Sequence, residues 1–175
     1  MFAAEIRKKR VARMRGFIQW RWHLDEVFVK INGKLRYLWR AVDHEGEVLE
    51  TVVTAKRDKA APLKFLKRIM KKYGQPRRVA TDGLCSYPAA MKEIGNANRH
   101  EVGHRLNNRA ENSHQPFRRR ERAMQRFRSA KTLQKFSSVH AQVHNHFNQE
   151  RHLISREVYK QKRSAAWAEW RALAA

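Results

Sequence analysis

The sequence predicts a mixed α/β domain in which helices pack against a sheet of antiparallel and parallel strands. Three strand-like runs come first, joined by two tight turns, between residues 22 and 55. An amphipathic segment over 58–74 and a fourth short strand over 76–83 follow. From about residue 108 the pattern is helical, so the predicted order is β-β-β-α-β-α-(β)-α-α.

The first three strands are predicted from their residue types and turns. The segment WHLDEVFVKI (22–31) is rich in aromatic and β-branched residues, which favour strands. NG at 32–33 is a strong hairpin signal, because both residue types tolerate the positive φ angles of a two-residue turn. A strand over 34–43, the turn DHEG at 43–46 and a strand over 47–55 complete an antiparallel meander.

The middle of the chain predicts one long helix and three short elements. Over 58–74, apolar side chains share one helical face and lysines the other, with Asp58 as the cap and Gly74 as the stop. After the fourth strand we expect a short helix over 86–95 and, less strongly marked, a short strand over 100–104.

Two long helices are predicted in the C-terminal half. The first runs from about Asn108 to Phe127, and the second covers 129–153. The apolar residues of the second helix recur at helical spacing and predict a buried stripe. That stripe consists of Leu133, Phe136, Val139, Val143 and Phe147.

The charge of the chain is extreme. Among 175 residues, 39 lysines and arginines stand against 16 acids, a net charge of +23, while 42% of the residues are apolar. A surface this positive implies a polyanionic partner, and nucleic acid is favoured over a membrane because no basic segment forms a clean amphipathic anchor. The lone cysteine excludes a disulfide framework, and no signal-peptide core is present. We therefore expect a cytoplasmic protein that works on nucleic acid.

Two acids stand out from the others by their context. Asp25 lies inside an apolar strand, where a carboxylate is costly unless it is paired or coordinates something. Asp82 lies at the carboxyl end of a strand, where open α/β sheets place ligands. A solvated strand end and an Asx turn are the bland alternatives for these two acids. Glu26 should point to the opposite face from Asp25, so we expect only one of that pair to join a shared site.

The order of elements sharpens this interpretation. A meander, a helix and a fourth strand place the first and fourth strands side by side, as in the ribonuclease H topology, which brings Asp25 and Asp82 together. Glu111, on a later helix, is placed to complete a cluster of three carboxylates. Such carboxylates repel one another, and a pair of Mg²⁺ ions bridging them would remove the repulsion and activate a phosphodiester.

Three motifs carry a resemblance to a known family. The segments WHLDEVFVKINGKLRYLWRAVDHEGEVLE, TDGLCSY and NNRAENSHQPFRRRERAMQRFRS resemble the integrase core of bacterial DDE insertion-sequence transposases, of the insertion sequence six group. The likeness runs from about residue 20 to the C-terminus. It implies a ribonuclease H-like fold, with Asp25, Asp82 and Glu111 as catalytic metal ligands. It also implies two Mg²⁺ ions (Mn²⁺ as a substitute), nicking at transposon ends and strand transfer by a 3′-hydroxyl.

The resemblance also suggests how the chain is divided. Family members carry a helix-turn-helix region before the first aspartate, whereas about 24 residues precede Asp25 here. We expect residues 1–21 to be a basic arm left from that region, 22–153 the catalytic core and 154–175 a helical tail. A truncated, non-catalytic DNA-binding remnant is the second hypothesis, and a ribonuclease H-like nuclease is the third. By analogy, a homodimer or larger assembly on DNA is expected, associated with the nucleoid.

The helix that carries Glu111 is the predicted DNA contact. From Arg99 to Lys135 the net charge is +8, and such a segment favours binding to phosphates without reading sequence. The resemblance places Arg118, seven residues after Glu111, near the DNA. Other predicted contacts are Arg119, Arg122 and His114, and His114 is also a candidate to support the metal ligands.

Two further features allow either a functional or a structural role. His140, His144 and His146, with His152 beyond them, could suggest a metal site, but structural or DNA-facing roles are favoured because no HExxH motif accompanies them. Most tryptophans are expected in the core or in interfaces. Trp22, close to Asp25, is the one candidate for DNA contact.

Overall fold

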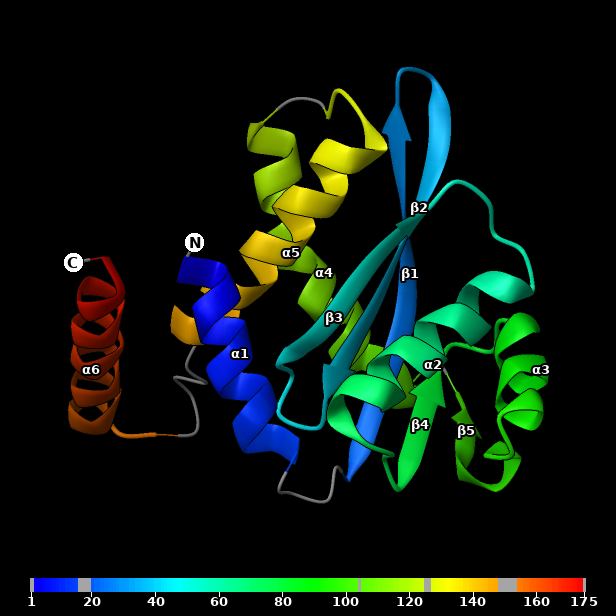
Figure 1. The fold of residues 1–175 in the computed structure, drawn as a ribbon, viewed down its shortest axis with the longest axis horizontal. Coiled ribbons are helices and arrows are strands. Elements are labelled where there is room, and N and C mark those ends of the chain that lie inside the picture. The colour runs from blue at the N-terminus through cyan, green and yellow to red at the C-terminus, as the bar shows by residue number, and fades with distance from the viewer. Residues whose placement is uncertain (1, 16–19, 104, 125–126, 148–153, 175) are drawn as a thin grey trace.

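A five-stranded mixed sheet forms the centre of the fold, in the order β3-β2-β1-β4-β5 (Figure 1). The structure is a computed structural model and describes residues 2–15, 20–103, 105–124, 127–147 and 154–174. The strands are β1 (Arg21–Ile31), β2 (Lys34–Asp43), β3 (Val48–Thr54), β4 (Arg78–Thr81) and β5 (His100–Val102). The first three are antiparallel and the last two run parallel to their neighbours, as predicted. The β1–β2 turn has Asn32 and Gly33 at φ 49° and 78°, the positive values that its sequence predicts.

Helices cover both faces of this sheet (Figure 1). They are α1 (Phe2–Arg15), α2 (Ala60–Tyr73), α3 (Ser86–Glu93), α4 (Asn108–Ala123), α5 (Ala130–Phe147) and α6 (Arg156–Ala174), with short 3-10 turns η1 (Ala97–Arg99) and η2 (Arg105–Asn107). One hydrophobic core joins the sheet to α2 and α3, and a second joins its other face to α4 and α5. The active-site candidates of β1 therefore lie between two helical layers.

The ends of α2 show how local sequence sets a helix. Asp58 Oδ1 accepts the N–H of Ala61 at 2.9 Å, and Gly74 at φ 83° donates its N–H to the Met70 carbonyl at 2.9 Å. The predicted cap and stop are confirmed. Between them, the apolar stripe is buried against the sheet through Phe65, Leu66 and Ile69.

The predicted apolar stripe of α5 is partly wrong. Leu133 is fully buried, but Val139 is 42% exposed, and the face turned to the sheet is largely polar. Asn145 donates to the Val48 carbonyl at 2.8 Å and accepts the Val48 N–H at 2.9 Å. Gln134 bonds β3 in the same way at two further points. The reason is that β3 is an edge strand, whose open backbone groups need partners.

The predicted boundaries in this region also shift. The helix of Glu111 ends at Ala123 instead of Phe127, and Phe127 is buried in the second core instead. The predicted helix 129–153 is described as far as Phe147, and its remaining residues lie outside the described part of the chain.

The two terminal segments are helices that dock on the domain. In α1, Ile6 and Met14 are buried, so the basic N-terminal segment packs against the fold. Phe147 of α5 meets the rings of Trp167 and Trp170 of α6, with centroids 5.0 and 5.4 Å away. Within the described segments, none of the helices combines the length and apolar character that crossing a membrane requires.

Candidate active site

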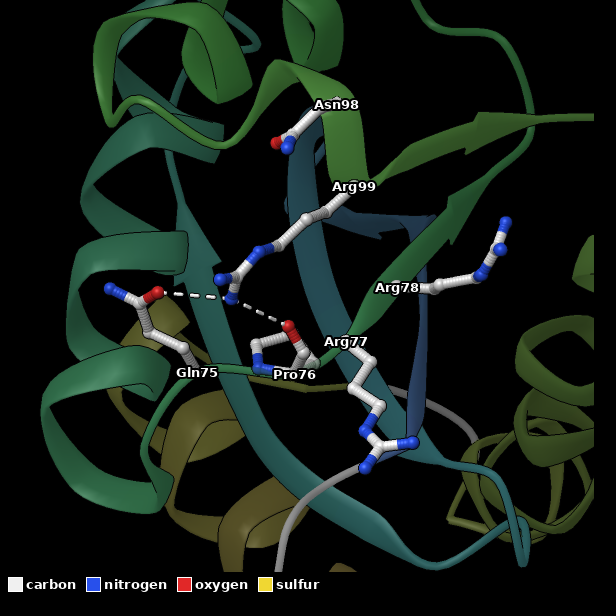
Figure 2. A pocket seen from close by; sticks show the side chains of 6 residues that line it. All are labelled: Gln75, Pro76, Arg77, Arg78, Asn98 and Arg99. Carbon is white, nitrogen blue, oxygen red and sulfur yellow. Dashed lines mark hydrogen bonds between the residues drawn. The ribbon is translucent and has the colours of Figure 1, made fainter.

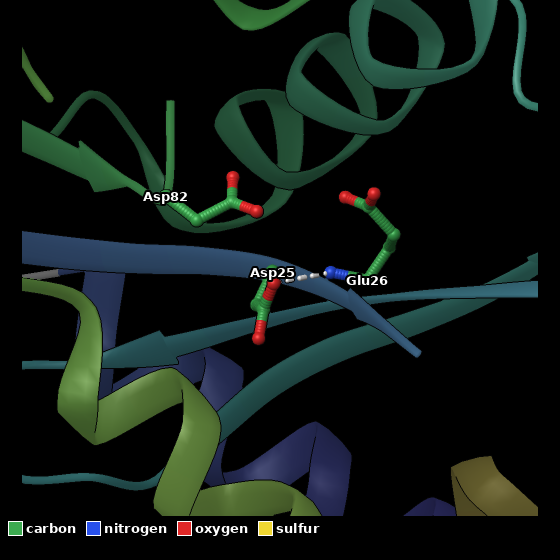
Figure 3. Close-up of side chains that lie close together, drawn as sticks. All are labelled: Asp25, Glu26 and Asp82. Atoms are coloured by element: carbon green, nitrogen blue, oxygen red, sulfur yellow. Dashed lines mark hydrogen bonds between the residues drawn. The ribbon is translucent and has the colours of Figure 1, made fainter. Parts of the chain in front are cut away.

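Asp25 and Asp82 meet at the edge of the sheet where β4 ends. The parallel pairing of β1 and β4 sets Leu24 opposite Thr81, so the next residue of each strand carries one of the two aspartates. One carboxylate oxygen from each of Asp25, Glu26 and Asp82 lies within 4.8 Å of the others (Figure 3). The topology therefore brings these two aspartates together as predicted. Asp82 Oδ1 also accepts the Leu84 N–H at 3.3 Å, so the Asx turn is present as well.

Glu26 joins this acidic group, and the prediction that only one of Asp25 and Glu26 could do so is wrong. The two side chains do leave β1 on opposite sides, as strand alternation requires (Figure 3). However, β4 ends beside Leu24, so β1 has no neighbour on that side at the two acids. Asp25 Oδ1 turns back to accept the Glu26 N–H at 2.9 Å. The open edge lets oxygens from both faces approach one another.

His114 holds the other oxygen of Asp25. Its Nε2 lies 3.0 Å from Asp25 Oδ2, and the side chains of both residues are mostly buried. Burial lowers the pKa of His114, while the bond to Asp25 acts in the opposite direction. A neutral imidazole therefore donates from Nε2 to the carboxylate, and it leaves a buried Nδ1 without a partner among the described residues.

Three side chains fasten α4 to β1. The residue before the helix, Asn107, donates to the Leu24 carbonyl at 3.0 Å. His114, the seventh residue of the helix, bonds Asp25, and Arg118 Nη2 donates to the Phe28 carbonyl at 2.6 Å. These contacts repeat along β1 at residues 24, 25 and 28, so α4 runs beside the strand that carries the acids.

Glu111 lies in the first turn of α4, three residues before His114, and is exposed. It does not join the group formed by Asp25, Glu26 and Asp82. The structure thus places Glu111 on the helix that contacts Asp25 but outside the acidic cluster. Its role as a third ligand stays a prediction.

Glu26 has a partner that the sequence reasoning missed. Its carboxylate forms an ion pair with Arg57, which comes from the loop between β3 and α2. Burial raises the pKa of Glu26 to about 7 against the opposing effect of Arg57, and the charges of Asp82 and Asp25 add to the rise. The position of Glu26 next to Asp25 in an apolar strand was a usable signal for the acid itself, but no local pattern predicts its pairing with a residue 31 positions away.

The predicted DNA-binding arginines of α4 differ in how they are placed. Arg118 is engaged, because Nη1 bonds Glu121 at 2.6 Å while Nη2 holds β1. Arg119 and Arg122 are exposed. Arg119 and Arg122 are therefore better placed than Arg118 to contact a phosphate backbone.

Two histidines of α5 form an aromatic stack, whereas His146 packs on Phe147 and Trp170. His140 and His144 are parallel, with centroids 5.9 Å apart, and His140 also packs on Phe136 at 5.4 Å. Burial lowers the pKa of His140 to about 4, helped by the charge of Arg40. Among the described residues no potential metal group contains these histidines, which favours the structural role; His152 lies outside the described part.

Trp22 is fully buried in the core under α2 and α3, so its predicted DNA contact is wrong. A separate basic pocket of 540 Å³ lies at the opposite end of β4 from the acids (Figure 2). It is lined by Gln75, Pro76, Arg77, Arg78, Asn98 and Arg99. Arg99 donates to Gln75 and to the Pro76 carbonyl, both at 3.0 Å. With no carboxylate in its lining, this pocket has no part in the acidic site.

Comparison with known proteins identifies relatives in sequence and in structure. A family model described as a DDE domain matches residues 19–150. Transposases of Staphylococcus aureus, one for the insertion sequence-like element IS431mec (strain Mu50 / ATCC 700699) and one for insertion sequence element IS257 in transposon Tn4003, are 34% identical over 128 residues. The match covers 70% of this chain and 57% of each relative, so the chain spans little more than half their length.

Solved structures share the fold at low sequence identity. The integrase catalytic core domain of HTLV-2, in complex with magnesium, superposes with a TM-score of 0.53 at 12% identity, covering 77% of this chain and 88% of that one. A simian T-cell lymphotropic virus intasome chain gives a TM-score of 0.60 at 17% identity, covering 78% of this chain and 51% of that one. The predicted ribonuclease H-like fold and the stated family resemblance are both confirmed.

Proposed function

We propose, from the premise that this chain belongs to the DDE domain family of insertion-sequence transposases, that it cleaves DNA strands and joins them to a target during transposition. The observation that carries the proposal is the approach of Asp25 and Asp82 at the end of β4, next to the helix that bears Glu111. The family match covers all three acids. Phosphoryl transfer between DNA strands is the chemistry that such a carboxylate site supports.

The donor atoms fit magnesium. Carboxylate oxygens are the ligands that Mg²⁺ prefers, and those of Asp25 and Asp82 lie within 4.8 Å of one another. When bound, two Mg²⁺ ions polarise the scissile phosphodiester and stabilise its attacking and leaving oxygens. We propose Asp25, Asp82 and Glu111 as the ligands, with Mn²⁺ as a substitute metal.

The neighbouring residues orient these acids and bind DNA. His114 bonds Oδ2 of Asp25 and the Glu26 N–H bonds Oδ1, so the two contacts fix the orientation of this carboxylate beside Asp82. Arg119 and Arg122, with the arginine at 118, are proposed to contact the phosphate backbone. Their contribution is electrostatic, so affinity for any DNA should fall steeply as salt increases. Since two transposon ends must be joined, we propose that two copies of the chain assemble on DNA.

Nicking and strand transfer on oligonucleotides that carry the ends of the element test the proposal. With Mg²⁺ or Mn²⁺, Glu111→Gln should reduce both activities by about 100-fold or more, because a carboxylate ligand is lost. Glu157→Gln is the matched control, since Glu157 is also an exposed glutamate in the first turn of a helix. Its activity should equal that of the wild type.

Two results would speak against the proposal. Unchanged activity in Glu111→Gln would remove Glu111 from the site. Salt-dependent DNA binding by the wild type, without metal-dependent cleavage, would instead favour the DNA-binding remnant.

A further inference from the structure

The side chain of Glu26 is buried with half of its carboxylate unused. Only 2% of that side chain is exposed, and Oε1 is paired with Arg57. Its other oxygen, Oε2, is buried and has no hydrogen-bond partner among the described residues. Leaving a buried carboxylate oxygen unpaired is costly, so an unused oxygen at this place points to a missing ligand.

A second buried polar atom faces the same site. Tyr87 is fully buried, and its hydroxyl also has no hydrogen-bond partner within the described part of the chain. Burial, followed by the charges of Glu26, Asp25 and Asp82, raises the pKa of Tyr87 well above its usual value. The hydroxyl therefore keeps its proton, and the charges of the three acids act on it.

The charges around the acidic group do not balance. Three carboxylates approach within 4.8 Å, and among the described residues Arg57, on Glu26, is the charged partner they have, because the His114 that bonds Asp25 is neutral. Like charges at this distance repel. A divalent cation among the three oxygens would relieve the repulsion.

We propose that Glu26 is a further ligand of the divalent cation held by Asp25 and Asp82, and that Arg57 competes with the cation for Glu26. This inference rests on the metal requirement of the proposed function and adds a ligand to it. The Arg57 side chain is 36% exposed, so it can leave Glu26 for solvent by giving up that ion pair and the Phe28 ring, which lies 5.5 Å away. The cation would thus be reached from both faces of β1.

The other acidic group in the structure differs from this one and provides a control. Asp43, Glu45 and Glu47 surround the β2–β3 turn, where Asp43 Oδ1 accepts the N–H groups of the other two at 2.9 Å. The turn itself explains that group, and Glu45 is exposed. Glu45→Gln therefore removes one negative charge from a surface acidic group without touching the Asp25 site.

Calorimetric titration of the full chain with Mn²⁺ tests the proposal. Glu26→Gln and Glu26→Asp should each weaken binding by about tenfold or more. Glutamine removes the negative charge, and aspartate keeps the charge but is too short to reach the cation. Arg57→Gln should tighten binding several-fold, since the competing cation is gone. Glu45→Gln should bind as the wild type does. The melting temperature of each variant without metal reports whether it is folded, and the rise on adding Mn²⁺ gives a second measure of affinity.

Contradicting results are separable from failure of the proposed function. Wild-type affinity in Glu26→Asp would show that Glu26 supplies only charge, and weaker binding in Arg57→Gln would show that Arg57 supports the site; either overturns the proposal. If Asp25→Asn abolishes binding while Glu26→Asp does not change it, only the inference on Glu26 fails. If Asp25→Asn and Asp82→Asn both bind as the wild type, the metal site of the proposed function fails as well.

Discussion

The two faces of the central sheet each hold a hydrophobic core, but beside the acids of β1 they differ in chemistry. Under α2 and α3, β1 and β2 present Trp22, Leu24 and Trp39, all fully buried in one hydrocarbon core. Under α4 and α5, the neighbouring positions present Asp25 and Arg40. These two residues lie opposite each other in the β1–β2 ladder and are buried as well. Strand alternation alone separates these two sets.

The difference teaches that beside the acids one face serves mainly stability and the other holds polar groups. Apolar burial contributes about 25 cal/mol per Å², and at this end of β1 it is largest on the α2 and α3 face. Buried polar groups contribute little net stability and cost free energy wherever a partner is missing. Glu26 and Glu50 are buried acids on the apolar face; Glu50 pairs with Lys72 of α2, whereas Glu26 lies where β4 has ended.

The largest effect is expected on the apolar face. Leu66 of α2 is fully buried in the first core, so Leu66→Ala should lower the free energy of unfolding by about 2–5 kcal/mol. Urea unfolding followed by circular dichroism measures it. A loss below about 1 kcal/mol would mean that this face is loosely packed and that the comparison does not hold.

The polar face should lose stability through hydrogen bonds. Asn145→Ala leaves the N–H and carbonyl of Val48 without the partners that cover this edge strand. We expect a loss of about 2–3 kcal/mol in the same urea experiment. Val139→Ala, at an exposed site of the same helix, should change stability by less than about 0.5 kcal/mol. Equal effects in both variants would contradict the anchoring role of Asn145.

Arg40 should give an effect of opposite sign. It is fully buried, burial lowers its pKa to about 10, and its three guanidinium nitrogens lack hydrogen-bond partners among the described residues. Arg40→Met keeps most of the volume and removes the charge, so the free energy of unfolding should rise by about 1–3 kcal/mol. A destabilised variant would show that the guanidinium has a stabilising partner.

The smallest effect concerns pH. The lowered pKa of His140 means that its stabilising contribution is complete above pH 6.5 and is lost as pH falls toward 4. His140→Phe keeps the ring packing on Phe136 and should lessen the acid destabilisation, by about 1 kcal/mol at pH 5. Melting temperatures of both proteins between pH 8 and 4.5 test this. Parallel curves would show that His140 does not titrate with unfolding.

Local patterns in the sequence determined the helices and strands and identified two of the acids of the candidate site. The meander, the hairpin turn and the ends of α2 depend on residue types within a few positions, and each is observed. Asp25 and Asp82 are identified by their own strands. Their approach follows from the order of elements. The fourth strand pairs with β1 in parallel and ends opposite Leu24, so the residues that follow Thr81 and Leu24 lie close together.

Only the tertiary structure decided which side chains complete the site. Glu26 joins Asp25 because β4 ends one residue earlier, and Arg57 arrives from a loop 31 positions away. Likewise, His114 meets Asp25 while Glu111 stays exposed, a choice made by how α4 docks on β1. Periodicity tells which face a residue occupies, but contact between elements depends on where strands end and helices pack, and no local pattern carries that information.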